Sequence, residues 1–227
     1  MKSATGIYMA FIIIFLWLGC IVLFMSTHLS FSNPLIYLLT LIQMHLYTGL
    51  FITAHDAMHG TVAPHNQKLN SLIGQVSTAL YALFPFGNLN TKHHKHHQFV
   101  HTKEDPDYHQ GNFFIWYFSF IKQYITWWQI VAMAIIYNVL KIWIIEQNLL
   151  MFWVIPSLLS TLQLFYFGTY LPHKGEHQNK HQSKSQSKNH IWAFFSCYFF
   201  GYHYEHHDSP VTPWWKLWQQ KEKNLEI

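Results

Sequence analysis

The chain has 227 residues, of which 51% are hydrophobic and only 11% are charged, and its formal net charge is +4. Ordinary soluble domains carry about 25% charged residues, so this composition excludes a typical soluble protein and favours a protein embedded in a bilayer. The basic residues are all lysines, and they form no basic stripe with interleaved aromatics, which argues against a nucleic-acid-binding surface.

Two long apolar blocks open the chain, whose length suits a single domain over residues 1–227. The first block, residues 5–27, has about the 20 residues that a helix needs to cross a bilayer. No small-residue cleavage site follows it, so we expect a retained membrane helix rather than a signal peptide. A second helix is predicted to begin at Pro34, a residue suited to a first helical turn, and to reach His55 or beyond.

The middle of the chain alternates apolar and polar segments. Residues 69–86 are too short and too polar to span a bilayer, which predicts an interfacial or re-entrant helix. Residues 88–112 are polar and rich in histidine, and the aromatic stretch 113–128 suits the headgroup level, where Trp and Tyr concentrate. A third span is predicted over residues 124–145 and a fourth over residues 149–171.

The remainder of the chain is mostly polar. Residues 172–190 are rich in Lys, Gln, Ser and His and are expected to form a solvated linker. An aromatic segment, 191–200, precedes another histidine cluster, and the amphipathic tail from Trp214 onward is expected to lie on the membrane surface. The predicted fold class is therefore an all-α integral membrane protein with about four transmembrane helices plus interfacial helices.

The lysines orient these predicted spans. With about four spans, the N-terminal end, residues 56–123 and residues 172–227 share one side of the membrane, and every lysine except Lys141 lies there. The positive-inside rule assigns that side to the cytoplasm, together with both termini. Lys141 lies near the far end of the third span, where it can extend outward or pair with Glu146.

Histidine is the outlying residue type, with 18 copies, and three groups lie just beyond apolar segments on the predicted cytoplasmic side. In the first group, the i, i+4 spacing of His55 and His59 puts both imidazoles on one helix face. The second and third groups repeat an H-x-x-H-H spacing, and one further histidine follows the fourth span. The candidate metal ligands are His55, His59, His93, His96, His97, His173, His203, His206 and His207.

The ligand type and number indicate the metal. Imidazole-rich sites suit Zn, Cu, Fe or Ni, and these candidates exceed what one first-row ion can hold, which implies two metals. Structural zinc would usually take cysteine ligands, but Cys20 and Cys197 lie apart in apolar stretches. Two irons with open positions for O₂ fit best. The acids expected to orient imidazole N–H groups are Asp56, Asp105, Asp107, Glu205 and Asp208.

Four stretches around these histidines resemble the motifs of bacterial beta-carotene ketolases. They are F-I-T-A-H-D-A-M-H-G-T at 51–61, H-x-x-H-H at 93–97 with E-D-P-D-Y at 104–108, L-P-H at 171–173, and F-G-Y-H-Y-E-H-H at 200–207. The three histidine boxes alone are shared by the whole membrane fatty acid desaturase and hydroxylase superfamily. The residues within the first and last boxes favour the ketolase branch, whereas the linker 174–190 departs from its pattern.

This resemblance implies a non-haem di-iron oxygenase that uses O₂ and an external electron donor of the ferredoxin type. It would oxidise C4 of a beta-ionone ring by two successive hydroxylations and loss of water, taking beta-carotene through echinenone to canthaxanthin. The carotenoid would come from the bilayer lipid. The bacterial family implies the inner membrane, with the metal site at its cytoplasmic face.

Other functions remain open from the sequence. A carotenoid ring hydroxylase, or a fatty acid desaturase or hydroxylase, would use the same histidine boxes. A divalent-metal transporter would place its ligands at mid-bilayer depth, where only His45 is expected, and we expect His45 to form a helix–helix hydrogen bond instead. A membrane haem protein would place isolated histidines on facing spans. No ligand role is assigned to His94 or His101.

Overall fold

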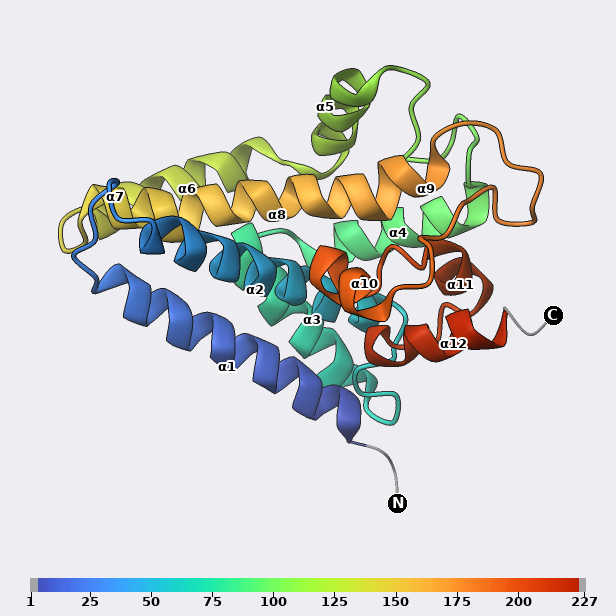
Figure 1. Ribbon diagram of the computed structural model, residues 1–227, viewed down its shortest axis with the longest axis horizontal. Helices are drawn as coiled ribbons and strands as arrows, with labels where there is room; N and C mark the ends of the chain where they lie inside the picture. Colours follow the sequence, from blue (N-terminus) through green and yellow to red (C-terminus); the bar gives the residue numbers. More distant parts are fainter. Residues whose placement is uncertain (1–3, 225–227) are drawn as a thin grey trace.

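The computed structural model describes residues 4–224, and over that range the chain folds only into helices and loops (Figure 1). The first six helices are α1 (Thr5–Met25), α2 (Leu35–Met58), α3 (Gln67–Ala82), α4 (Phe86–Phe99), α5 (Phe113–Tyr124) and α6 (Trp127–Leu140). They are followed by α7 (Glu146–Leu149), η1 (Leu150–Val154), α8 (Ile155–Phe165), η2 (Tyr166–Tyr170) and α9 (Leu171–His173). The chain continues with α10 (His190–Cys197), α11 (His203–Asp208), η3 (Trp214–Lys216) and α12 (Leu217–Lys223).

Three helices are long and apolar enough to cross a membrane. They are α1, α2 and the continuous helix Glu146–His173, which joins α7 to α9 through the two π-helical segments η1 and η2. These helices match the predicted first, second and fourth spans. The two chain ends, which are predicted to be cytoplasmic, lie outside the described residues. The single domain over residues 1–227 stays a prediction.

The predicted third span is shorter than expected. Its helix α6 has 14 residues, about 21 Å at 1.5 Å per residue, against about 30 Å of bilayer hydrocarbon. The helix cannot begin earlier because Ile125 and Thr126 are extended, and Gln129 Oε1 accepts the Thr126 N–H. In Figure 1, α6 starts beside the middle of α8 and runs to the end of the bundle where α7 lies.

The predicted re-entrant segment is a helix that packs along α2. Helix α3 is capped by Asn66, whose side chain accepts the Leu69 N–H, and it ends at Leu83 in a left-handed conformation with φ of 56°. After this reversal, α4 carries the second histidine group toward the end of α2. The polar segment around residues 88–99 is therefore helical.

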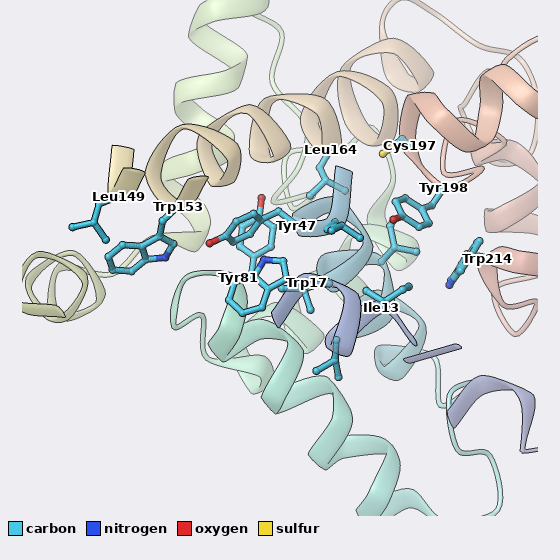
Figure 2. Close-up of a cluster of buried hydrophobic side chains, with 14 residues drawn as sticks. Ile13, Trp17, Tyr47, Tyr81, Leu149, Trp153, Leu164, Cys197, Tyr198 and Trp214 are labelled. Atoms are coloured by element: carbon cyan, nitrogen blue, oxygen red, sulfur yellow. The ribbon is translucent and has the colours of Figure 1, made fainter. Parts of the chain in front are cut away.

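Aromatic packing and hydrogen bonds between helices hold the bundle together. Trp17, Tyr47 and Tyr81 form a buried chain of edge-to-face contacts between α1, α2 and α3 (Figure 2). The Tyr81 hydroxyl lies 2.8 Å from Thr161 Oγ1 and 3.1 Å from Ser160 Oγ on α8. Such polar contacts fix helix pairs in an apolar medium, where packing alone discriminates little.

The far end of the bundle carries the predicted lysine pair. Lys141 Nζ lies 2.8 Å from Glu146 Oε1, which confirms the expected pairing. In Figure 1 this turn between α6 and α7 lies at the opposite end from α4 and α11, which bear histidine groups.

We expect Tyr81→Phe to lower the stability of the bundle by about 1 kcal/mol, because its hydroxyl joins α3 to α8 in an apolar interior. The matched control is Tyr8→Phe on α1, where the side chain is exposed. Denaturant titration of the purified protein in detergent measures the difference. Equal unfolding midpoints for the two variants would contradict this role of Tyr81.

Candidate metal centre

The ends of several helices deliver the candidate ligands to one place. His55 lies in the last turn of α2 and His59 is the C-cap residue that follows it, with ring centroids 5.0 Å apart. The helix stops there because Gly60 adopts φ of 72°, a conformation that glycine takes without strain. Helices α4 and α11 each supply three histidines, and α9 ends at His173. The structure thus brings together all nine histidines predicted from the sequence.

The nitrogens of the first group converge within a small volume. His55, His59, His93 and His206 each offer one ring nitrogen, and these atoms all lie within 4.8 Å of one another. The Nε2 atoms of His59 and His93 are 2.7 Å apart. His97 lies at the edge of this group, with its Nε2 atom 3.1 Å from that of His93 and 3.0 Å from that of His206.

The second group is fully buried and holds the other four histidines. They are His96, His173, His203 and His207, whose ligand atoms again lie within 4.8 Å of one another. Nε2 of His203 is 2.9 Å from that of His173 and 2.9 Å from that of His207, and the His96–His207 separation is 3.2 Å.

These separations fit shared metal ions. Imidazole nitrogens bind first-row metals at about 2.0–2.1 Å, so two ligands at right angles on one ion lie about 2.8–3.0 Å apart. A neutral imidazole has a single N–H, and His55 Nε2 has no hydrogen-bond partner among the described residues although it is buried. Its ring lies 4.5 Å from the rings of His93 and His206, so a cation between them would satisfy it.

Two histidines of the second group are oriented through their Nδ1 atom. His96 Nδ1 donates to Asp105 Oδ1 at 2.9 Å, and Asp105 also accepts the His101 N–H. His173 Nδ1 donates to the Gln182 carbonyl at 3.0 Å. Donation from Nδ1 leaves each Nε2 as the acceptor nitrogen, which is the arrangement that metal-binding histidines use.

Two other predicted acids lie beside the histidines. Asp56 Oδ1 is 3.6 Å from His55 Nδ1, while Asp56 Oδ2 accepts the Trp214 N–H and so anchors the C-terminal segment to α2. Asp107 Oδ2 is 4.0 Å from His96 Nδ1, and the carboxylate accepts a hydrogen bond from the Tyr124 hydroxyl.

The structure does not give Glu205 and Asp208 the predicted orienting role. Glu205 faces away from the imidazoles because two residues along a helix rotate a side chain by about 200°, and it accepts from Ser185 and Lys221. Asp208 ends α11 and pairs instead with His181 at 3.1 Å.

The segment predicted as a solvated linker covers the second group. Lys184 N–H donates to the Pro172 carbonyl and Gln186 N–H to the Gly201 carbonyl, both at 2.8 Å, and Ser183 is 1% exposed. Backbone hydrogen bonds hold this segment over the second group. The polar composition of residues 181–186 therefore did not predict that the segment covers the histidines.

The remaining uncertain histidines lie outside both groups. His101 Nε2 donates to the His173 carbonyl at 2.5 Å, and His94 is exposed, with Nδ1 2.9 Å from the Asn90 carbonyl. His45 stacks on Tyr198 with ring centroids 4.3 Å apart. Its Nε2 atom has no hydrogen-bond partner among the described residues, so the helix–helix hydrogen bond expected there is not seen at this atom.

A mostly apolar cavity lies against both histidine groups. It contains about 770 Å³ of empty space, its open mouth included. The lining histidines come from both groups, and Asp107 and Tyr124 are among the few other polar residues. The apolar lining includes Phe51, Met58, Phe84, Leu89, Phe120, Ile121, Ile125, Leu164 and Phe200.

Comparisons with known proteins agree with this site. The fatty acid desaturase family model matches residues 32–147 and 112–226. A beta-carotene ketolase of Paracoccus sp. (strain PC1) is 36% identical over 192 residues, which cover 82% of this chain and 79% of that protein. The chain belongs to the fatty acid desaturase family and, within it, to the beta-carotene ketolases. The resemblance drawn from the sequence is thereby confirmed.

Algal members of the ketolase family are longer than this chain. Beta-carotene 4-ketolase 3 of Haematococcus lacustris is 41% identical over 186 residues, covering 76% of this chain and 58% of that protein. Zeaxanthin 4-ketolase of Chlamydomonas reinhardtii is 42% identical over 183 residues, covering 76% and 41% respectively. The chain thus spans about half the length of these relatives. No solved structure matches it.

The electrostatics of this ketolase-family site favour neutral imidazoles. Burial, with repulsion from His94, lowers the pKa of His59 to about 4, and burial with repulsion from His59 and other histidines lowers the pKa of His97 to about 2. Burial also opposes charge on His96, but its hydrogen bond to Asp105 and the nearby Asp107 carboxylate raise its pKa overall. Neutral rings keep their lone pairs available for metal.

We expect Asp105→Asn to weaken metal retention by about 10–100-fold, because the neutral amide holds the His96 ring less firmly than a carboxylate. Asp208→Asn is the matched control, since it removes the same charge from a residue whose ion pairs are with Lys180 and His181, neither of which belongs to the nine histidines. Metal analysis of purified protein after dialysis against graded chelator measures retention. Parallel loss curves for both variants would contradict the assignment.

Proposed function

We propose that the chain is a non-haem di-iron beta-carotene 4-ketolase. The observation that carries the proposal is the convergence of nine imidazoles, in two groups, against one apolar cavity. The proposed ligands of the first iron are His55, His59, His93, His97 and His206. The proposed ligands of the second iron are His96, His173, His203 and His207.

The chemistry that the bound irons would supply is oxidation of a C–H bond with O₂. Each hydroxylation takes one O₂, two electrons and two protons, and releases one water. A second hydroxylation at the same carbon gives a gem-diol, which loses water to leave the ketone. The electrons would come from an external donor of the ferredoxin type. The chain itself would hold the ring beside the imidazoles and keep water from it with the apolar lining of the cavity.

The relatives support C4 of a beta-ionone ring as the target. The names of two relatives specify ketolation at position 4, one for beta-carotene and one for zeaxanthin. A hydrocarbon substrate dissolved in lipid also suits a cavity lined mainly by aromatic and aliphatic side chains. The product sequence would be beta-carotene, echinenone and canthaxanthin.

The location that we propose is the cytoplasmic face of a bacterial inner membrane. Both histidine groups lie at the opposite end of the bundle from the turn that holds Lys141 (Figure 1). Of the other lysines, Lys2 precedes α1 and the rest lie within residues 68–122 and 174–223, the two stretches that follow α2 and α9. This asymmetry is what the positive-inside rule requires. Helix α6, the third of the predicted spans in chain order, would complete the set of four.

A pigment assay tests the activity. In a host that accumulates beta-carotene, the wild-type chain should convert orange pigment to red keto-carotenoids, whereas His55→Ala, His96→Ala and His206→Ala should each abolish conversion, because each removes a proposed ligand. His94→Ala is the control, since that ring is exposed. Chromatography of the extracted pigments measures the products. Hydroxylated carotenoids or altered acyl chains in place of ketones would contradict the proposed reaction.

Thiol labelling tests the orientation. We expect Ile142→Cys, beside Lys141 and 71% exposed, to react with a membrane-impermeant reagent in intact cells. Gln110→Cys, exposed in the loop after the second histidine group, should react only after the membrane is opened. The parent chain measures background from Cys20 and Cys197. The reverse pattern of labelling would place the histidine groups on the other side.

A further inference from the structure

A second apolar groove adjoins the cavity at the histidines and lies toward the far end of the bundle. One wall is α6 and the other is the helix from η1 to α8. The residues that line both spaces are Tyr81, Phe84, Ile121, Ile125 and Thr161. Because these residues are shared, the groove and the cavity adjoin each other.

One face of the long helix Glu146–His173 runs through both spaces. Six of its lining residues are spaced alternately by four and three, which keeps them on a single helix face. These six are Leu150, Val154, Ser157, Thr161, Leu164 and Gly168, and Trp153, Leu158 and Thr169 line the spaces beside them. From Leu150 to Gly168 this face extends for about 27 Å at 1.5 Å per residue. That length far exceeds one cyclohexene ring and approaches the roughly 30 Å of bilayer hydrocarbon.

The groove is apolar and opens to lipid. None of the described residues that line it is charged. Ile130 on α6 is 58% exposed and Leu158 on α8 is 59% exposed, so the rim of the groove faces the hydrocarbon phase. Ala134 and Ser157, one on each wall, have small side chains that leave the groove free.

We propose that the groove between α6 and η1–α8 binds the polyene chain and the distal ring of a forty-carbon carotenoid while the ring to be oxidised lies in the cavity. This assignment rests on the proposed ketolase function and deepens it. Three observations select this occupant: the groove adjoins the cavity, the two spaces together have a length that suits an extended polyene, and the lining of the groove is uncharged.

With this placement, binding in the groove depends on the length of the substrate. A full-length carotenoid would bury its polyene against both walls, and that burial contributes binding free energy in proportion to the area covered. An apocarotenoid with the same ring and a polyene cut after a few isoprene units would fill the cavity without reaching the groove. A block in the groove should therefore penalise the long substrate and spare the short one.

The test compares keto-product formation from beta-carotene and from such a truncated apocarotenoid, with purified membranes of Ala134→Trp, which fills the groove. We expect activity on beta-carotene to fall about tenfold or more relative to activity on the short substrate. The matched control is Ile135→Trp, one residue along α6 and 59% exposed outside the groove, which should change that ratio less than about twofold. Ser157→Phe blocks the groove from the opposite wall and should reproduce the effect.

The outcomes separate the groove from the activity itself. Equal losses on both substrates, or no loss in either blocking variant when normalised to metal content, would overturn the groove assignment and leave the ketolase function standing. Wild-type membranes that form no keto product from either substrate would overturn both. Altered acyl chains whose yield falls in Ala134→Trp would assign the groove to a lipid chain instead.

Discussion

The structure depends on one constraint, which is that buried imidazoles crowd together at the end of a helical bundle. Their Nε2 atoms lie as close as 2.7 Å, and burial lowers the pKa values of most of those outside the spans. A neutral ring has only one N–H to donate, so these rings cannot all satisfy one another. Cations between them would supply the missing partners, and the surrounding fold fits that requirement.

The fold meets this constraint by ending its helices in the same place. Helix α2 ends at Met58, directly before His59 and Gly60, and the long helix that ends in α9 has His173 as its last residue. The short helices α4 and α11 lie against those ends. Asp105 and the backbone of the segment 181–186 then hold individual rings. The groove that we propose for the polyene runs along α8 and adjoins the same place, which would suit a substrate dissolved in the bilayer.

Much of this arrangement could be predicted from the sequence. The repeated spacing of the histidines and their position beyond apolar blocks predicted all nine histidines of the two groups. The apolar blocks predicted the three long helices. The cover over the second group could not be predicted, because backbone atoms such as the Gln182 carbonyl make it. Helix α6 is short because the backbone is extended at Thr126. Glu205 faces away from the imidazoles because it lies on the helix α11, and its acidic residue type alone does not reveal that direction.

The count and ligation of metal in the purified chain test the central claim most directly. Metal analysis combined with X-ray absorption at the iron edge should find about two irons per chain, each in a first shell dominated by imidazole nitrogen. Spectra should show no Soret band. A single iron per fully folded chain, a sulfur- or carboxylate-dominated first shell, or a haem spectrum would contradict a di-iron centre built from these nine histidines.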